Sequence, residues 1–194
     1  DIKFSNVAWN DDKGVFYKKN SNKEFFAKDS TYQLYYHKIG DIQSKDQLVF
    51  DTSNTKSNFS FFTKQNKLFI VETSEDETTK NYYYSTIENE SFQFKNFIKD
   101  DKSNLELLNI INDKFYFSDE KYSWGNISYF DINNRTENIV LIPQVYSHLL
   151  VGATFLENYI ICKYDNMGKY YMSIHDYTGK FIRKFEAPHN MDFQ

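Results

Sequence analysis

The chain has 194 residues, of which 40% are apolar and 19% aromatic, and its formal net charge is −4 at pH 7. This aromatic content excludes a disordered chain. The negative charge and the lack of a basic stripe argue against nucleic acid as a partner, and no apolar run approaches the length that spans a membrane. Cys162 has no second cysteine to pair with, which predicts a reducing compartment such as the cytoplasm.

Segments rich in Tyr, Phe, Ile and Val follow one another along the chain, separated by short turns of Asn, Asp and Gln, as is typical of β-strands. In chain order they are IKFSNVAW, GVFY, YQLYYHKI and QLVF; NFSFFT, KLFIVET, NYYYSTI and FQFKNFI; LELLNI, KFYFS, ISYFDI and NIVLI; and HLLVGATF, YIICKY, YYMSIHDY and KFIRKF. The leucines of 105–111 hint at a helix, but the place of this segment in the series predicts a strand.

Four such strands recur with a period of forty-odd residues. The ends of the third strands, at Ile39, Ile87, Ile132 and Tyr177, lie 45 to 48 residues apart. This is the period of a β-propeller blade. We therefore predict an all-β fold, a β-propeller of about four consecutive four-stranded blades over 1–194, with blades at approximately 1–51, 52–100, 101–144 and 145–188.

The first blade carries a more specific signal in a series of short motifs. In order they are Phe4-Ser5, Ala8-Trp9, Lys13-Gly14, Phe16-Tyr17, Tyr35-Tyr36-His37, Gly40 and Gln43-Ser44-Lys45-Asp46. This stretch resembles the propeller domain of prolyl oligopeptidases, serine peptidases that cleave short proline-containing peptides. The resemblance is weaker from 52 to 88, poor from 89 to 169, and partly returns at 173–187.

The resemblance implies an interior segment of a seven-bladed propeller that caps an α/β-hydrolase domain of the same protein and excludes large substrates. In the family the catalytic Ser, Asp and His lie on the hydrolase domain, so no catalytic residue is assigned here and the chain alone should hydrolyse nothing. Residues 18–31 correspond in location, but not in sequence, to a family loop that influences substrate entry. A substrate-gating role for Lys19, Lys23 and Lys28 is therefore a hypothesis.

Other chemistry finds little support in the sequence. The Gly-x-Ser-x-Gly nucleophile elbow of α/β-hydrolases does not occur. The four histidines, His37, His148, His175 and His189, are far apart and have no second ligand at metal spacing, and Cys162 in an apolar run is typical of a buried residue. We predict no metal site and no cofactor.

The sequence thus favours a non-catalytic, substrate-filtering propeller segment of a prolyl-oligopeptidase-like endopeptidase, with short peptides as ligands. One alternative is a non-enzymatic propeller that binds protein partners. Another is a carbohydrate-binding module, which would need an exposed Trp9 or Trp124, whereas packing between blades is the default for both. An open arc of blades also exposes apolar blade faces, which could lead to self-association.

Overall fold

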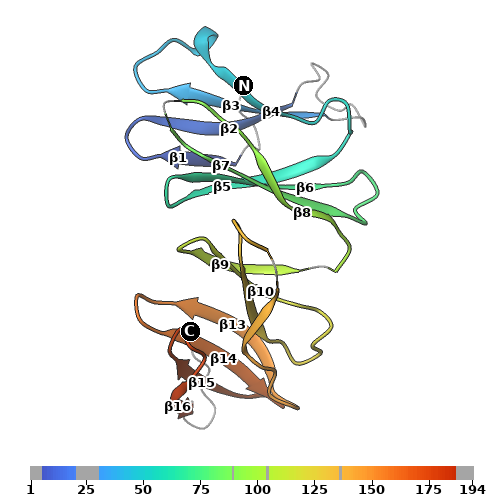
Figure 1. The fold of residues 1–194 in the computed structure, drawn as a ribbon, viewed down its shortest axis with the longest axis vertical. Helices are drawn as coiled ribbons and strands as arrows, with labels where there is room; N and C mark the ends of the chain where they lie inside the picture. The colour runs from blue at the N-terminus through green and yellow to red at the C-terminus, as the bar shows by residue number, and fades with distance from the viewer. Residues whose placement is uncertain (1–5, 21–30, 89, 104, 136, 187–194) are drawn as a thin grey trace. The chain divides into compact units, whose positions relative to one another are not determined.

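The computed structural model describes residues 6–20, 31–88, 90–103, 105–135 and 137–186. Within these ranges sixteen strands and one short 3-10 helix form four antiparallel sheets of four strands each. Each sheet is a meander, in which strands that follow one another in the chain pair with one another (Figure 1). The predicted all-β fold with four four-stranded units is confirmed.

The chain divides into two compact units, and the first comprises residues 1–102. Its sheet 1 contains β1 (Val7–Asn10), β2 (Gly14–Asn20), β3 (Tyr32–Lys38) and β4 (Gln47–Asp51), with the 3-10 helix η1 (Gln43–Lys45) before β4. Its sheet 2 contains β5 (Asn58–Lys64), β6 (Lys67–Thr73), β7 (Lys80–Thr86) and β8 (Lys95–Asp101).

The second unit comprises residues 103–194. Its sheet 3 contains β9 (Glu106–Ile111), β10 (Lys114–Ser118), β11 (Ile127–Asp131) and β12 (Ile139–Ile142). Its sheet 4 contains β13 (Leu149–Phe155), β14 (Ile160–Asn166), β15 (Lys169–His175) and β16 (Phe181–Glu186). The strand predicted over 105–111 is present as β9.

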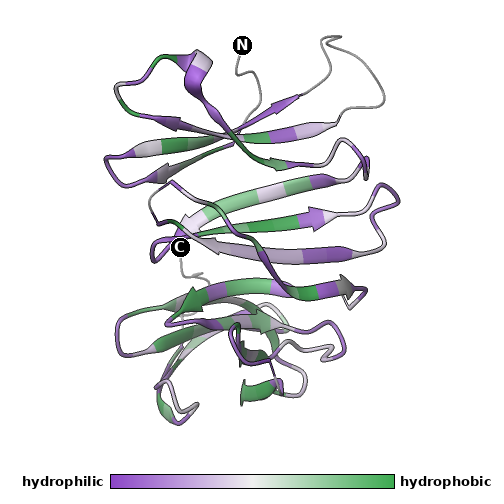
Figure 2. Cartoon of the chain, turned by 45° about the horizontal axis from the view of Figure 1, so that its top comes forward, coloured by the Kyte–Doolittle hydropathy of each residue, from purple (hydrophilic) through white to green (hydrophobic). Residues whose placement is uncertain are grey.

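Short polar turns set the register of these hairpins. Gln65 and Asn66 join β5 to β6 with φ angles of 48° and 56°, and Asn112 and Asp113 join β9 to β10 with φ angles of 48° and 62°. Two consecutive left-handed residues make the hairpin turn whose twist matches that of the flanking strands. The hydropathy colouring follows this division, with apolar residues along the strands and polar residues at the connections (Figure 2).

The core of the first unit lies between sheets 1 and 2. Alternation along β2 and β3 directs Phe16, Leu34 and Tyr36 into it, where Phe59 and Leu68 of sheet 2 also lie. The opposite face of β3 carries Tyr35, whose ring stacks on Tyr17 at 5.8 Å. Large side chains on both faces of this strand are therefore explained by two separate packing surfaces.

The connection between β7 and β8 differs from the sequence expectation. The segment FQFKNFI was predicted to be strand throughout, but β8 begins only at Lys95. Phe92 packs on Phe16 and Tyr36, and Phe94 packs on Phe50, so both rings turn toward sheet 1. Residues 90–94 therefore form a strap that belongs to sheet 2 in sequence and lies against sheet 1.

In the second unit a corresponding core joins sheets 3 and 4. It buries Ile127 and Ile142 from sheet 3 together with Ile160, Cys162 and Tyr164 from sheet 4. The turn that follows β15 lies close to this interface, because a Cβ atom on Gly179 would fall inside van der Waals contact with the carbonyl oxygen of Leu141. Only glycine fits there without a shift.

The packing expected for Trp9 is wrong. Its side chain is 61% exposed. Ala8, the preceding residue, joins the core between sheets 1 and 2, and alternation along β1 turns Trp9 to the other face of sheet 1. Trp124 is half-buried and meets the ring of Tyr146 edge to face at 5.9 Å.

Candidate functional site

The residues predicted to gate substrate entry begin at the end of β2. Lys19 is exposed, and its Nζ atom lies 5.8 Å from the centre of the Tyr35 ring. Lys23 and Lys28 lie outside the described residues. The structure therefore places one of the three lysines, on the face of sheet 1 that also carries Tyr17, and the gating role of all three stays a prediction.

The neighbouring Lys18 is a residue that sequence reasoning missed. Its Nζ atom donates to Asn58 Oδ1 at 2.5 Å and to the carbonyl oxygen of Phe59 at 2.7 Å, and it lies 4.0 Å from the centre of the Tyr32 ring. Burial lowers the pKa of this ammonium to about 8. The sequence did contain a signal for this position: Lys18 is two residues from Phe16 on the same strand, so both side chains point toward sheet 2. The contacts make it a link between the sheets.

A buried carboxylate lies in sheet 2, next to the connection between sheets 1 and 2. Glu72 of β6 is 7% exposed. Its Oε1 atom accepts hydrogen bonds from the hydroxyls of Thr55, at 3.2 Å, and Ser57, and its Oε2 atom accepts one from Tyr83 at 2.9 Å. Because its two oxygens are held by hydroxyls of the same unit, this carboxylate orders the fold rather than offering a ligand contact.

Two pairs of side chains have the residue types of hydrolytic machinery. Ser173 Oγ lies 2.9 Å from His175 Nε2, but the Nδ1 atom of that histidine faces the carbonyl oxygen of Gly179 at 3.3 Å, and both side chains are buried. His37 Nδ1 lies 2.6 Å from Asp46 Oδ1, and Asp46 Oδ2 accepts from Tyr17. The two pairs share no residue, so neither is a Ser-His-Asp triad.

Over the part of the chain that the structure describes, neither a reactive thiol nor a metal centre adds other chemistry. Cys162 is fully buried, and this burial raises its pKa to about 12, which keeps the thiol protonated and unreactive. Within the described ranges, no group of three or more His, Cys, Asp or Glu side chains could hold a metal ion. Over the same ranges, no helix has the length and apolar character needed to cross a membrane.

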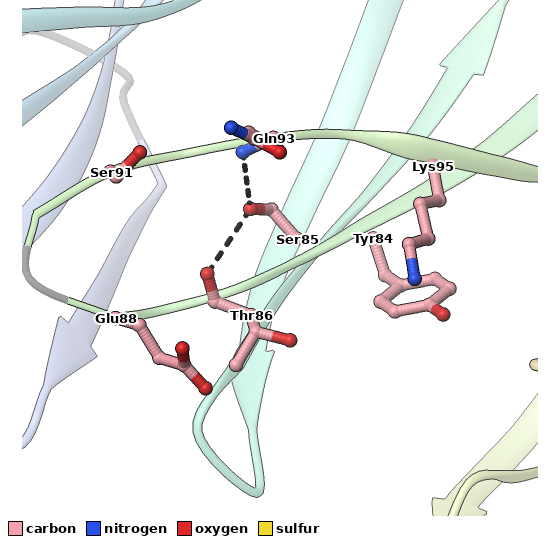
Figure 3. A pocket seen from close by; sticks show the side chains of 7 residues that line it. All are labelled: Tyr84, Ser85, Thr86, Glu88, Ser91, Gln93 and Lys95. Atoms are coloured by element: carbon pink, nitrogen blue, oxygen red, sulfur yellow. Dashed lines mark hydrogen bonds between the residues drawn. The ribbon is translucent and has the colours of Figure 1, made fainter.

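A hollow of about 350 Å³ opens in sheet 2 where β7 ends and the chain returns to β8 (Figure 3). Polar side chains dominate its lining, which consists of Tyr84, Ser85, Thr86, Glu88, Ser91, Gln93 and Lys95. We call it the β7–β8 pocket. This pocket is not predictable from the sequence, because these residue types are those of any exposed turn.

Hydrogen bonds fix the walls of the β7–β8 pocket. The Ser85 hydroxyl accepts from the backbone N–H of Gln93 at 2.9 Å and donates to the carbonyl oxygen of Thr86 at 3.2 Å (Figure 3). Glu88 and Ser91 pair as an isolated antiparallel bridge. The strap that forms one wall is also held from behind, where Phe92 packs into the core between sheets 1 and 2.

The position of the pocket follows from the antiparallel order of sheet 2. The β6–β7 and β7–β8 connections lie at opposite ends of β7. Within the four-strand repeat, the β6–β7 turn corresponds to the β2–β3 connection, which contains two of the predicted gating lysines, Lys23 and Lys28, and follows directly on Lys19 in β2. The pocket therefore lies at the other end of its sheet from the turn that corresponds to the predicted gate.

Comparison with known proteins agrees with the four-sheet fold. Residues 1–193 match the model of the prolyl oligopeptidase N-terminal β-propeller domain. Prolyl oligopeptidase B from Galerina marginata, bound to a 35mer hydrolysis and macrocyclization substrate, has a similar structure with a TM-score of 0.77 at 15% identity. The match covers 95% of this chain and 28% of that one.

A second solved structure, oligopeptidase B from Trypanosoma brucei with covalently bound antipain, matches with a TM-score of 0.69 at 13% identity, over 96% of this chain and 27% of that one. No curated protein matches the chain. The chain thus spans little more than a quarter of these solved structures. Since the family match extends over nearly every residue, the chain belongs to the prolyl oligopeptidase family and lies in its N-terminal β-propeller domain.

Proposed function

We propose that this chain is the non-catalytic, substrate-filtering segment of a serine endopeptidase that cleaves short proline-containing peptides. The observation that carries the proposal is the match of residues 1–193 to the propeller domain of the family, together with the four-sheet fold. The catalytic residues would lie on an α/β-hydrolase domain of the same protein. The lone cysteine of the present chain, Cys162, is buried and suits a reducing compartment. We therefore propose that the protein is located in the cytoplasm.

The physical basis of such a filter is stiffness. Each described unit is two sheets packed through an aromatic core, and such cores do not deform continuously. A folded domain of 100 residues has a radius of gyration of about 13 Å. An extended peptide is no thicker than one strand of a sheet, in which neighbouring strands lie about 4.8 Å apart. A rigid wall can therefore admit the peptide and exclude the domain.

The first experiment uses the full-length parent protein. Peptides with one internal proline and increasing length, followed by a folded protein with an exposed Gly-Pro bond, should show kcat/KM falling with size and no cleavage of the folded protein. The 194-residue chain alone should leave a fluorogenic Gly-Pro peptide intact. Cleavage of the folded protein at the rate of a short peptide would refute the filter, and turnover by the purified chain would refute a non-catalytic role.

The gate is tested in the same full-length protein. Replacing Lys19, Lys23 and Lys28 together with methionine should change kcat/KM for long peptides more than for a dipeptide substrate, because the dipeptide needs less of the entrance. Lys99, which lies on β8, provides a matched control when changed to methionine. Unchanged kinetics for both substrates would remove the gating role while leaving the filter intact.

The alternative of a non-enzymatic scaffold depends on the parent protein. Peptide mapping of the native gene product distinguishes the two. A Gly-x-Ser-x-Gly peptide in the same polypeptide supports the peptidase, and a product that lacks it moves the proposal to a protein-binding propeller, for which the exposed Tyr146 and Trp9 would be the first residues to test.

A further inference from the structure

The β7–β8 pocket carries one cation and one anion at its two ends. Lys95 is exposed at the start of β8, directly opposite Tyr84 in the strand register, and its Nζ atom lies 5.9 Å from the centre of the Tyr84 ring. Glu88 is exposed at the other end, beside the bridge to Ser91. The close-up shows Lys95 and Glu88 at the two ends of the hollow, with Thr86 between them (Figure 3).

The strand sets the separation of the backbone positions of Glu88 and Lys95. Glu88 follows Tyr84 by four residues, and Lys95 is the register partner of Tyr84. At about 3.3 Å per residue, four residues of extended chain span roughly 13 Å. An extended peptide of three or four residues measures about 10 to 13 Å, so its terminal groups come within reach of the two side chains.

The neighbouring carboxylate is already used. Glu90, two residues beyond Glu88, forms an ion pair with Lys38 of β3 at 2.5 Å and does not line the pocket. Glu88 is thus the carboxylate that faces the hollow. Between Glu88 and Lys95 the wall offers the hydroxyls of Thr86 and Ser91 and the amide of Gln93, which suit the peptide groups of a ligand.

We propose that the β7–β8 pocket binds short peptides of three or four residues with free termini, holding the terminal ammonium at Glu88 and the terminal carboxylate at Lys95. The proposal rests on the proposed function to this extent: an endopeptidase generates fragments with new free termini, and these are zwitterions of the required length. It assigns to sheet 2 a binding site at the opposite end from the β6–β7 turn, separate from the predicted gate.

We expect the pocket to bind such peptides weakly, because both charged side chains are exposed to solvent. Ion pairs open to solvent each strengthen binding only about fivefold. Two of them, with the hydrogen bonds of the wall, give a dissociation constant of about a millimolar. A peptide with blocked termini loses both pairs and should bind at least tenfold more weakly.

Titration by nuclear magnetic resonance tests the proposal on the whole 194-residue chain. The probe is Ala-Ala-Pro with free termini, and the matched ligand is the same tripeptide with an acetylated N-terminus and an amidated C-terminus. The backbone amide signals of Ser85, Thr86, Ser91 and Gln93 should shift with the free tripeptide. Equal binding of the blocked peptide, no shift up to about 10 mM, or shifts elsewhere only would overturn the proposal.

Charge variants give a second, independent readout. Lys95→Met and Glu88→Gln should each weaken the free tripeptide about three- to fivefold and leave the blocked peptide unchanged. Lys99→Met on β8 and Glu75→Gln in the β6–β7 turn remove the same charges from exposed positions of sheet 2 outside the pocket and should have no effect. Because these titrations measure no hydrolysis, a negative result would refute the peptide site and leave the filtering function untouched. Conversely, cleavage of a folded protein would refute the filtering function even if the tripeptide binds.

Discussion

Lys18 brings a positive charge into the interface between sheets 1 and 2. Two oxygen atoms of the Asn58–Phe59 segment and the faces of the Tyr32 and Phe59 rings surround its ammonium group. These contacts do not fully replace water, since burial lowers the pKa from 10.5 to about 8. The same residue therefore links the sheets and makes their stability depend on pH.

The sign of that dependence follows from proton binding. Between pH 8 and 10.5 the unfolded chain holds the Lys18 proton more often than the folded chain, so the free energy of unfolding rises with pH. We expect the wild-type chain to gain about 1 kcal/mol relative to Lys18→Met from pH 8 to pH 10, a figure reduced for solvent screening. Urea unfolding at both pH values measures it. A Lys19→Met control should follow the wild type, and a pH-independent difference between wild type and Lys18→Met would contradict the assignment.

Single residues also mark the limit of sequence reasoning. Period-2 alternation places Phe16, Leu34 and Tyr36 on one face of sheet 1, but it does not say which face meets a neighbouring sheet. Trp9 was expected in a core because of its size, and it lies on the other face because Ala8 takes the interface. Residue type alone does not choose between two faces that both carry aromatic side chains.

At the scale of elements, the hairpin turns determine how neighbouring sheets approach. Gly168 and Gly179 have almost the same φ, 82° and 83°, in the turns on either side of β15. A Cβ atom on Gly168 would meet nothing within 4 Å, whereas one on Gly179 would collide with Leu141 of sheet 3. Substitutions at these two glycines therefore separate the free-energy cost of the left-handed backbone conformation from that of the contact with Leu141.

Gly168→Ala should destabilise the chain by about 1 kcal/mol, the cost of a left-handed φ for a residue with a Cβ atom. Gly179→Ala should add to this the shift of the β15–β16 turn away from sheet 3, for a total of about 3 kcal/mol. Thermal unfolding of both variants gives the comparison. Equal losses would show that the turn moves freely and does not fix the packing of sheets 3 and 4.

The strands themselves were accessible from the sequence, because β-branched and aromatic runs between Asn- and Asp-rich turns recur with a constant period. The strap before β8 was not. Phe92 and Phe94 alternate with Gln93 as they would in a strand, and only the Ser85 hydroxyl, which takes the Gln93 N–H, shows that ladder pairing stops there. The β7–β8 pocket depends on this departure, so it could not be predicted either.

At the scale of the whole molecule, one face of sheet 1 carries several exposed apolar side chains. The strand register puts Val7, Trp9, Val15, Tyr35 and Leu48 on the same face. Val7, Trp9 and Leu48 are 49%, 61% and 46% exposed. Neighbouring apolar side chains with this exposure are typical of a surface that packs against another polypeptide.

We expect the isolated chain to self-associate through this face. Trp9→Ser should raise the dissociation constant of the dimer about tenfold or more, because an aromatic anchor typically contributes over 1.4 kcal/mol to an interface. Sedimentation velocity over a range of concentrations measures the change. Met167→Ser, which alters a side chain that is 92% exposed on a turn of the other unit, should have little effect. A chain that stays monomeric at every concentration would rule the interface out.

The strap over sheet 1 also orders events while the protein is being synthesised. Phe16 and Tyr36 are translated before the ring that packs across them, because that ring belongs to Phe92, more than fifty residues later in the chain. Until then part of the apolar face of sheet 1 stays exposed to solvent. Nascent chains in such a state associate with one another or with chaperones. A translational pause before Phe92 has emerged from the ribosome would prolong this exposure, and a pause after it has emerged would not.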